Sequence, residues 1–191
     1  MMSAGRTPSQ TIGPFFHRAM LRDDGNDLAA RGALGVQIVI EGRVLDGDGL
    51  PVGDAMVEIW QANAAGRYDH PDDRQDKPLD PNFHGFGRTA TDADGYFRLR
   101  TIKPGPVRET GDFTQAPHIN VSIFARGLLN RLVTRIYFPD ESLNSTDPVL
   151  SAVPAPRRPT LTARRIGEES ANRFRFDIIL QGPAETVFFD A

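Results

Sequence analysis

The stretch that decides the fold is VQIVIEGRVLDGDGLPVGDAMVEIWQAN, residues 36–63. Apolar and polar side chains alternate in its first part, so Val36, Ile38 and Ile40 are expected to face the same side of a strand. The MVEIW run near its end repeats this alternation. Between the two runs, DGDG at 46–49 is typical of a tight turn in which glycine supplies positive φ. The stretch therefore predicts two strands joined by a turn.

Similar signals recur along the rest of the chain. The further strands are expected in TDADGYFRLR (91–100), HINVSIFARG (118–127), NRLVTRIYF (130–138) and RFRFDIILQG (173–182). A short helix is expected in DPVLSAV (147–153), followed by the proline-rich connector PAPRRPT (154–160), and one short helical turn is expected within the loop at 18–35. Many short strands, regular turns and few helical periods predict an all-β fold, a β-sandwich of mostly antiparallel strands.

The chain divides into an arm and one domain. Residues 1–17 contain Pro, Gly, Ser and Thr, and residues 18–35 are polar and Gly-rich, so residues 1–35 are expected to be an N-terminal arm and connector, whereas residues 36–191 form the sandwich domain. Phe15 and Phe16 follow a Gly-Pro pair in the arm, so they are expected to dock on this domain or on another one. The loop at 62–90 is long for a compact domain, which favours a functional or interface role.

Composition excludes several classes of protein. The 191 residues carry a net charge of -3, and no run of Lys and Arg is interleaved with aromatics, so a nucleic-acid binder is not indicated. The chain has no cysteine, which excludes disulfides, zinc ribbons and thiol catalysis. No segment approaches the roughly 18 apolar residues of a membrane span, and the N-terminus lacks the pattern of a signal peptide. A cytoplasmic protein is expected.

Metal ligands are suggested by APHINVSIF, residues 116–124. On a strand, His118 and Asn120 project from the same face, as the two imidazoles of a His-x-His metal site would. Tyr68 follows a Gly-Arg pair and has the hard anionic oxygen, as phenolate, that suits ferric iron. The alternatives are a buried, hydrogen-bonded histidine and a loop tyrosine that packs over the sheet.

Other catalytic patterns are missing or have a simpler explanation. The sequence has no HExxH, no G-x-S-x-G and no phosphate-binding Walker loop. The Asp-Gly clusters at 46–49 and 92–95 lack the spacing of an EF-hand, so hairpin turns are expected rather than calcium loops. The carboxylate pairs Asp72-Asp73 and Asp92/Asp94 are expected on the solvated surface.

Several segments together resemble the intradiol ring-cleavage dioxygenases, and within them the α chains of the heteromeric members. They run in the same order and cover most of the chain: TPSQTIGPFF (7–16), EGRVLDGDGLPVGDAMVEIWQANAAGRYDH (41–70), FGRTATDADGYFRLRTIKPGPV (86–107), APHINVSIFARG (116–127), TRIYFPDE (134–141) and RFRFDIILQGPAETVFFD (173–190).

The resemblance implies that the family's iron site is incomplete in this chain. The catalytic chain of the family holds Fe(III) with two tyrosines and two histidines. Tyr68 matches the first tyrosine and His118 the first histidine, but the second positions are occupied by Val107 and Asn120, and an arginine of the catalytic chain is matched by Gln115. Valine has no donor atom and a neutral amide is a poor ligand for iron. The resemblance therefore implies that this chain binds no metal and has no catalytic residues of its own.

The resemblance also implies a partner and a substrate. A homologous β chain is expected to bind the Fe(III), and the holoenzyme to cleave 3,4-dihydroxybenzoate (protocatechuate) with O2 to 3-carboxy-cis,cis-muconate. This chain is expected to line the substrate cavity of the β-chain site with Thr11, Gly13, Pro14 and Arg126. A guanidinium can bind a carboxylate through two hydrogen bonds. The alternative for Arg126 is an ion pair with a purely structural role.

Two other interpretations stay open at this point. The paired hairpin segments also resemble the prealbumin-like sandwich, so a binding or scaffolding module without a metal is one alternative. A self-sufficient dioxygenase that recruits His84 in DPNFHGFGR is the other.

Overall fold

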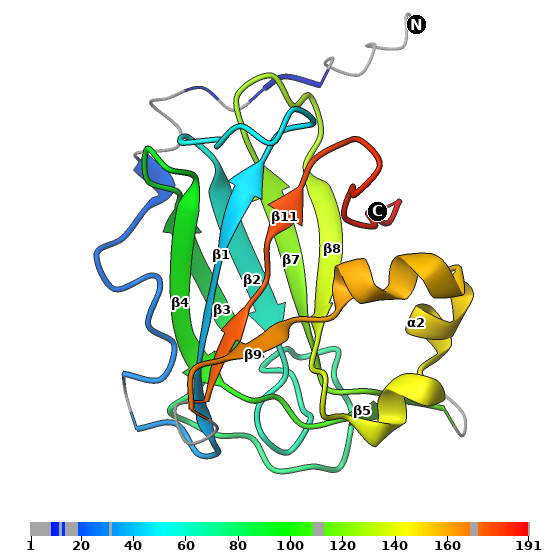
Figure 1. The fold of residues 1–191 in the computed structure, drawn as a ribbon. Coiled ribbons are helices and arrows are strands. Elements are labelled where there is room, and N and C mark those ends of the chain that lie inside the picture. The colour runs from blue at the N-terminus through cyan, green and yellow to red at the C-terminus, as the bar shows by residue number, and fades with distance from the viewer. Residues whose placement is uncertain are drawn as a thin grey trace, which may run out of the picture.

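The computed structural model describes residues 9–11, 13, 19–30, 32–108, 113–168 and 172–190. Two β-sheets pack face to face, and short helices lie beside them (Figure 1). The first sheet contains β1 (Gln37–Leu45), β4 (Tyr96–Ile102), β9 (Arg164–Ile166), β10 (Arg173–Arg175) and β11 (Ile178–Ile179). The second contains, in spatial order, β3 (Phe86–Ala90), β2 (Met56–Gln61), β7 (His118–Phe124) and β8 (Leu132–Tyr137).

The remaining elements are short. A two-stranded ribbon pairs β5 (Val107–Arg108) with β6 (Thr114–Gln115), and three short helices follow β8: η1 (Ser142–Ser145), α2 (Pro148–Ala152) and η2 (Ala155–Leu161). Most strand pairs are antiparallel, whereas β10 and β11 run parallel to β1. The expected all-β sandwich is thereby confirmed, as is the helix expected in 147–153.

The core lies between the two sheets and follows the alternation of the sequence. Ile38 and Ile40 of β1 are at most 2% exposed, and they pack in one cluster with inward residues of the second sheet. In β7 the inward residues are Ile119, Val121 and Ile123, so the intervening side chains of β7 point away from the core. This alternation places His118 and Asn120 on the outer face of the second sheet.

Both Asp-Gly clusters are tight turns, as expected, but the strands on either side of each turn do not pair as a hairpin. The Asp46 carboxylate accepts from the backbone N–H groups of Asp48 and Leu50, and Asp92 accepts in the same way from Asp94 and Tyr96. Each carboxylate is therefore used to close its own turn. Each turn lies on the path from a strand of one sheet to a strand of the other, because β1 and β2, and likewise β3 and β4, belong to different sheets.

Three boundaries differ from the expectation. The long loop ends at Gly85, where positive φ and a bond from Gln61 N to Gly85 O start β3 against β2. Val36 is 54% exposed and lies before β1, so it does not share the core face. The proline-rich connector forms the helix η2, because proline is tolerated in a first helical turn.

The last long strand is also divided. Residues 173–182 form β10 and β11, and between them Phe176 N donates to Glu41 O while the Asp177 carboxylate accepts from Arg43 N. A Cβ at Gly42 would lie 1.8 Å from Phe176 O. The close approach of the two backbones at Gly42 therefore accompanies the break in the ladder.

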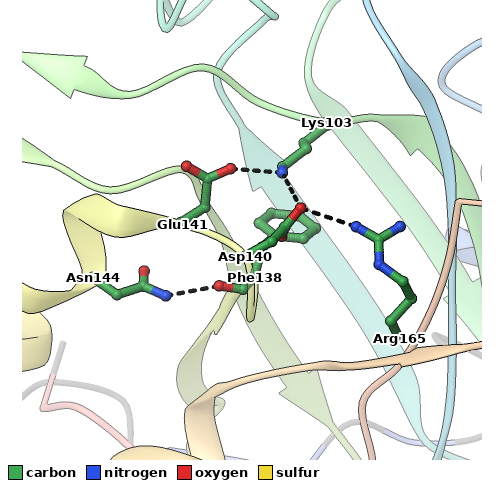
Figure 2. A network of polar contacts seen from close by, with 6 residues as sticks. All are labelled: Lys103, Phe138, Asp140, Glu141, Asn144 and Arg165. Atoms are coloured by element: carbon green, nitrogen blue, oxygen red, sulfur yellow. Dashed lines mark hydrogen bonds and ion pairs between the residues drawn. The ribbon is translucent and has the colours of Figure 1, made fainter. Parts of the chain in front are cut away.

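A polar network joins the end of β4 to segments after β8 and to β9 (Figure 2). Lys103 Nζ lies 3.1 Å from Asp140 Oδ2 and 2.6 Å from Glu141 Oε1, and Arg165 Nη2 lies 2.9 Å from the same Asp140 oxygen. Burial alone would lower the pKa of Lys103, but its bonds to the two carboxylates outweigh burial and raise it. Asn144 Nδ2 donates to Phe138 O nearby. Among the described residues, no helix is long and apolar enough to cross a bilayer.

Candidate functional site

Tyr68, His118 and Asn120 lie in direct contact on the outer face of the second sheet. The Tyr68 hydroxyl lies 3.2 Å from His118 Nε2 and accepts from Asn120 Nδ2 at 3.1 Å. His118 Nδ1 lies 2.7 Å from Ala116 O, so this nitrogen carries the hydrogen and Nε2 is left to accept from Tyr68. The three side chains thus satisfy one another.

The electrostatics of this cluster favour its neutral forms. Burial, then the nearby Arg135 guanidinium, lowers the pKa of His118 to about 4. Burial also raises the pKa of Tyr68, against the opposing effect of the Asn120 bond and of Arg135. The cluster at neutral pH is therefore a phenol bonded to a neutral imidazole.

Neighbouring strands position the cluster. The register places Trp60 and Arg135 opposite Asn120, on its two sides. The Trp60 and Tyr68 rings stack, with centroids 5.6 Å apart and planes inclined by 20°. Arg135 Nη1 donates to Gln115 Oε1 at 2.9 Å. A guanidinium thus lies beside the cluster and is held by the side chain of Gln115.

Two residues of this region were not singled out from the sequence. Arg135 lies on the outward face of β8, which the alternation of NRLVTRIYF indicates in retrospect. Asp147 is fully buried and accepts from Ala116 N at 2.7 Å, Leu150 N at 2.8 Å and Tyr137 Oη at 3.1 Å. It caps α2 and fixes the segment that leads into His118. The Asp-Pro pair at a helix start signals the cap but not the bond to residue 116.

Donor atoms for a metal are few around Tyr68. Val107 of β5 is buried and offers no ligand atom. The potential ligands Tyr68 Oη, His118 Nε2 and the Asn120 amide are already bonded to one another. Across the described parts of the chain, no group of three or more His, Asp or Glu side chains could hold a metal ion. One phenol, one imidazole and one amide beside a fixed cation do not fit a ferric ion.

The second set of predicted residues lies at the other end of β7. Thr11 Oγ1 accepts from Gly127 N at 2.8 Å and donates to Ala125 O at 3.3 Å. These bonds tie the arm to the residues on either side of Arg126. Gly13 has open space where a Cβ would lie. Pro14, like Phe15 and Phe16, falls outside the described residues.

The Arg126 side chain is directed by a carboxylate of its own chain. Its Nε lies 2.6 Å from Asp54 Oδ2, and the side chain is 74% exposed. A guanidinium has five N–H donors, so a contact at Nε leaves donors on the exposed side chain for a further acceptor. A cavity of about 370 Å³ adjoins this end of the sheet, lined by Thr11, Phe124 and Leu128 among others.

The residues around Tyr68 and those around Arg126 lie at opposite ends of β7, so they do not form one site. His118 begins β7 and Phe124 ends it, and a strand of this length spans about 20 Å at roughly 3.3 Å per residue. Figure 1 shows the first described residues of the arm near the β7–β8 connection, at the opposite end of the sandwich from β5. His84 Nδ1 lies 2.7 Å from Asp69 Oδ2, and His84 lines a separate cavity with Gly25 and Arg88 that does not include Tyr68.

Comparisons with known proteins show the family. The Dioxygenase_C family model, described as dioxygenase, matches residues 12–182. This chain belongs to the intradiol dioxygenase family. It is 44% identical over 198 residues to the protocatechuate 3,4-dioxygenase alpha chain of Pseudomonas putida, with 96% of each chain covered.

Two further matches support membership of this family. The protocatechuate 3,4-dioxygenase beta chain of Burkholderia cepacia is 46% identical over 155 residues, which cover 78% of this chain and 66% of that one. Among solved structures, the dioxygenase domain of a dioxygenase–carbohydrate-binding fusion from Streptomyces sp. SirexAA-E has a TM-score of 0.63 and 28% identity, covering 93% of this chain and 99% of that one. The matches favour the dioxygenase over the prealbumin-like module.

Proposed function

We propose that this chain is the α subunit of a heteromeric protocatechuate 3,4-dioxygenase. The observation that carries the proposal is full-length similarity to α chains together with a Tyr68 site that lacks the donors for iron. The holoenzyme would cleave 3,4-dihydroxybenzoate with O2 to 3-carboxy-cis,cis-muconate. A homologous β chain would be the partner, and the similarity to a β chain of the same enzyme supports this pairing.

The Fe(III) of the holoenzyme is assigned to the β chain. Three features of this chain support the assignment: Val107 provides no ligand, Asn120 replaces an imidazole by an amide, and the Arg135 guanidinium lies where a trivalent cation would meet repulsion. Tyr68 and His118, which match a tyrosine and a histidine ligand of the family, are hydrogen-bonded to each other. The ligands of the iron at which the ring is cleaved would therefore come from the β chain.

This chain would shape the substrate cavity with its arm and Arg126. The bonds of Thr11 to residues 125 and 127 support this role, because they hold this part of the arm beside Arg126. A Gly-Pro turn brings backbone close to a ligand without a bulky side chain. The Nη groups of Arg126 would bind the substrate carboxylate, while Asp54 holds the guanidinium at Nε. The purely structural alternative is that the pair with Asp54 is the whole role of Arg126.

Steady-state kinetics of the co-expressed αβ complex separates these roles. Arg126→Ala is expected to raise KM for protocatechuate about tenfold, because a charged hydrogen bond contributes about 1.5–3 kcal/mol, and to change KM for catechol little. Arg98→Ala, which removes an exposed arginine of β4, is the matched control. An equal effect of Arg126→Ala on both substrates would assign it the structural role. Oxygen uptake by this chain alone would contradict the proposed function.

A further inference from the structure

The outer face of the second sheet carries a cavity that the proposed function does not use. Its volume is about 570 Å³, within the range of small-molecule sites. It is lined by the stacked rings of Trp60 and Tyr68, by Val107, and by residues of the loop that follows Tyr68 and of β5: His70, Asp72, Asp73, Arg74, Gln75 and Arg108.

The walls of this cavity are fixed by hydrogen bonds. Gln75 Nε2 donates to Gly66 O at 3.1 Å, and Gln75 Oε1 accepts from Arg108 N at 3.0 Å. Lys77 Nζ donates to Pro106 O at 2.7 Å. These bonds hold the loop against the start of β5. The cavity is therefore formed without a ligand, so that little ordering is required when one binds.

The acidic side chains that line the cavity have partners within the described residues, whereas its two arginines form no ion pair there. Asp73 accepts from Tyr68 N at 2.7 Å and from Gln75 N at 3.0 Å. Asp72 Oδ2 lies 3.7 Å from His70 Nδ1. In contrast, neither Arg74 nor Arg108 forms an ion pair with a carboxylate of the described part of the chain. The described part of the rim thus carries two guanidinium groups without such a partner, beside the carboxylates of Asp72 and Asp73 and above an apolar and aromatic floor.

We propose that this cavity binds an aromatic carboxylate reversibly. The ring would lie against the apolar surface of Trp60, Tyr68 and Val107, where aromatic contacts are favourable. The carboxylate would accept hydrogen bonds from the guanidinium of Arg108, with Arg74 supplying further positive charge. A neutral isostere has no such partner and would bind weakly. The cavity exists whether or not the proposed function of the chain is right.

Tryptophan fluorescence of the purified full-length chain tests the proposal. Trp60 is the single tryptophan of the chain and lines the cavity, so its emission reports on occupancy. The probes are benzoate and its neutral isostere benzamide, at matched ionic strength. Benzoate is expected to change the emission saturably, with an affinity about tenfold above that of benzamide, because a charged hydrogen bond is worth about 1.5–3 kcal/mol.

Variants locate the bound probe. Arg108→Ala is expected to weaken benzoate binding about tenfold and leave benzamide unchanged, whereas the Arg98→Ala control stays within about twofold. Val107→Phe fills the cavity and should abolish the saturable signal, while thermal unfolding shows that this variant is folded. Equal affinities for the two probes, a non-saturable change, or the same affinity in Arg108→Ala would overturn the proposal. None of these readouts depends on iron or turnover.

Discussion

Acid is expected to destabilise this chain through His118. Its pKa falls from 6.5 to about 4 on folding, chiefly because burial disfavours the imidazolium. Above pH 6.5 the imidazole is neutral in both the folded and the unfolded chain, so protonation of His118 does not reduce the free energy of unfolding there. As pH falls from 6.5 toward 4 the unfolded chain binds the proton first. At about 1.4 kcal/mol per unit, this costs up to about 3 kcal/mol of the free energy of unfolding.

Urea unfolding at a series of pH values between 7 and 4 measures this effect. The free energy of unfolding of the parent chain minus that of His118→Gln cancels the titration of carboxylates that both chains share. That difference is expected to shrink by up to about 3 kcal/mol as pH falls through this window. A flat difference for His118→Gln would refute the account of a neutral, buried imidazole.

Three further substitutions test the framework around the sites. Asp147→Asn presents an amide to the N–H of Ala116 and is expected to lower the free energy of unfolding by about 2–3 kcal/mol in urea titrations. Gly42→Ala sets a methyl group against the backbone of Phe176, so a loss above about 2 kcal/mol and a lower Tm by calorimetry are expected. Lys103→Met removes the cation of the Figure 2 network; a loss of about 1 kcal/mol that shrinks in high salt is expected.

Much of the fold could be predicted because it depends on local patterns. Period-two alternation identified the strands and placed His118 and Asn120 on one outward face, as the structure shows. Turn chemistry identified the clusters at Asp46 and Asp92, where one carboxylate binds two backbone N–H groups within four residues. In each case the responsible contacts join residues that are close in the sequence.

The missed features depend on contacts between distant residues. The strand β3 is defined by its pairing with β2, and the break between β10 and β11 accompanies the approach of Phe176 to Gly42. Asp147 reaches back to Ala116, and the Tyr68–His118 bond spans 50 residues of sequence. Periodicity does not contain such pairings. The resemblance drew attention to Tyr68 and His118, but only the structure shows that they bond to each other.

Iron analysis tests the central claim most directly. The co-expressed αβ complex would be purified, its two chains separated under non-denaturing conditions, and the metal content of each measured by mass spectrometry beside its visible spectrum. The account predicts a colourless chain without stoichiometric iron, and a β chain that carries the ferric ion and its tyrosinate absorption. Stoichiometric iron in this chain, lost on replacing Tyr68 by phenylalanine, would contradict it.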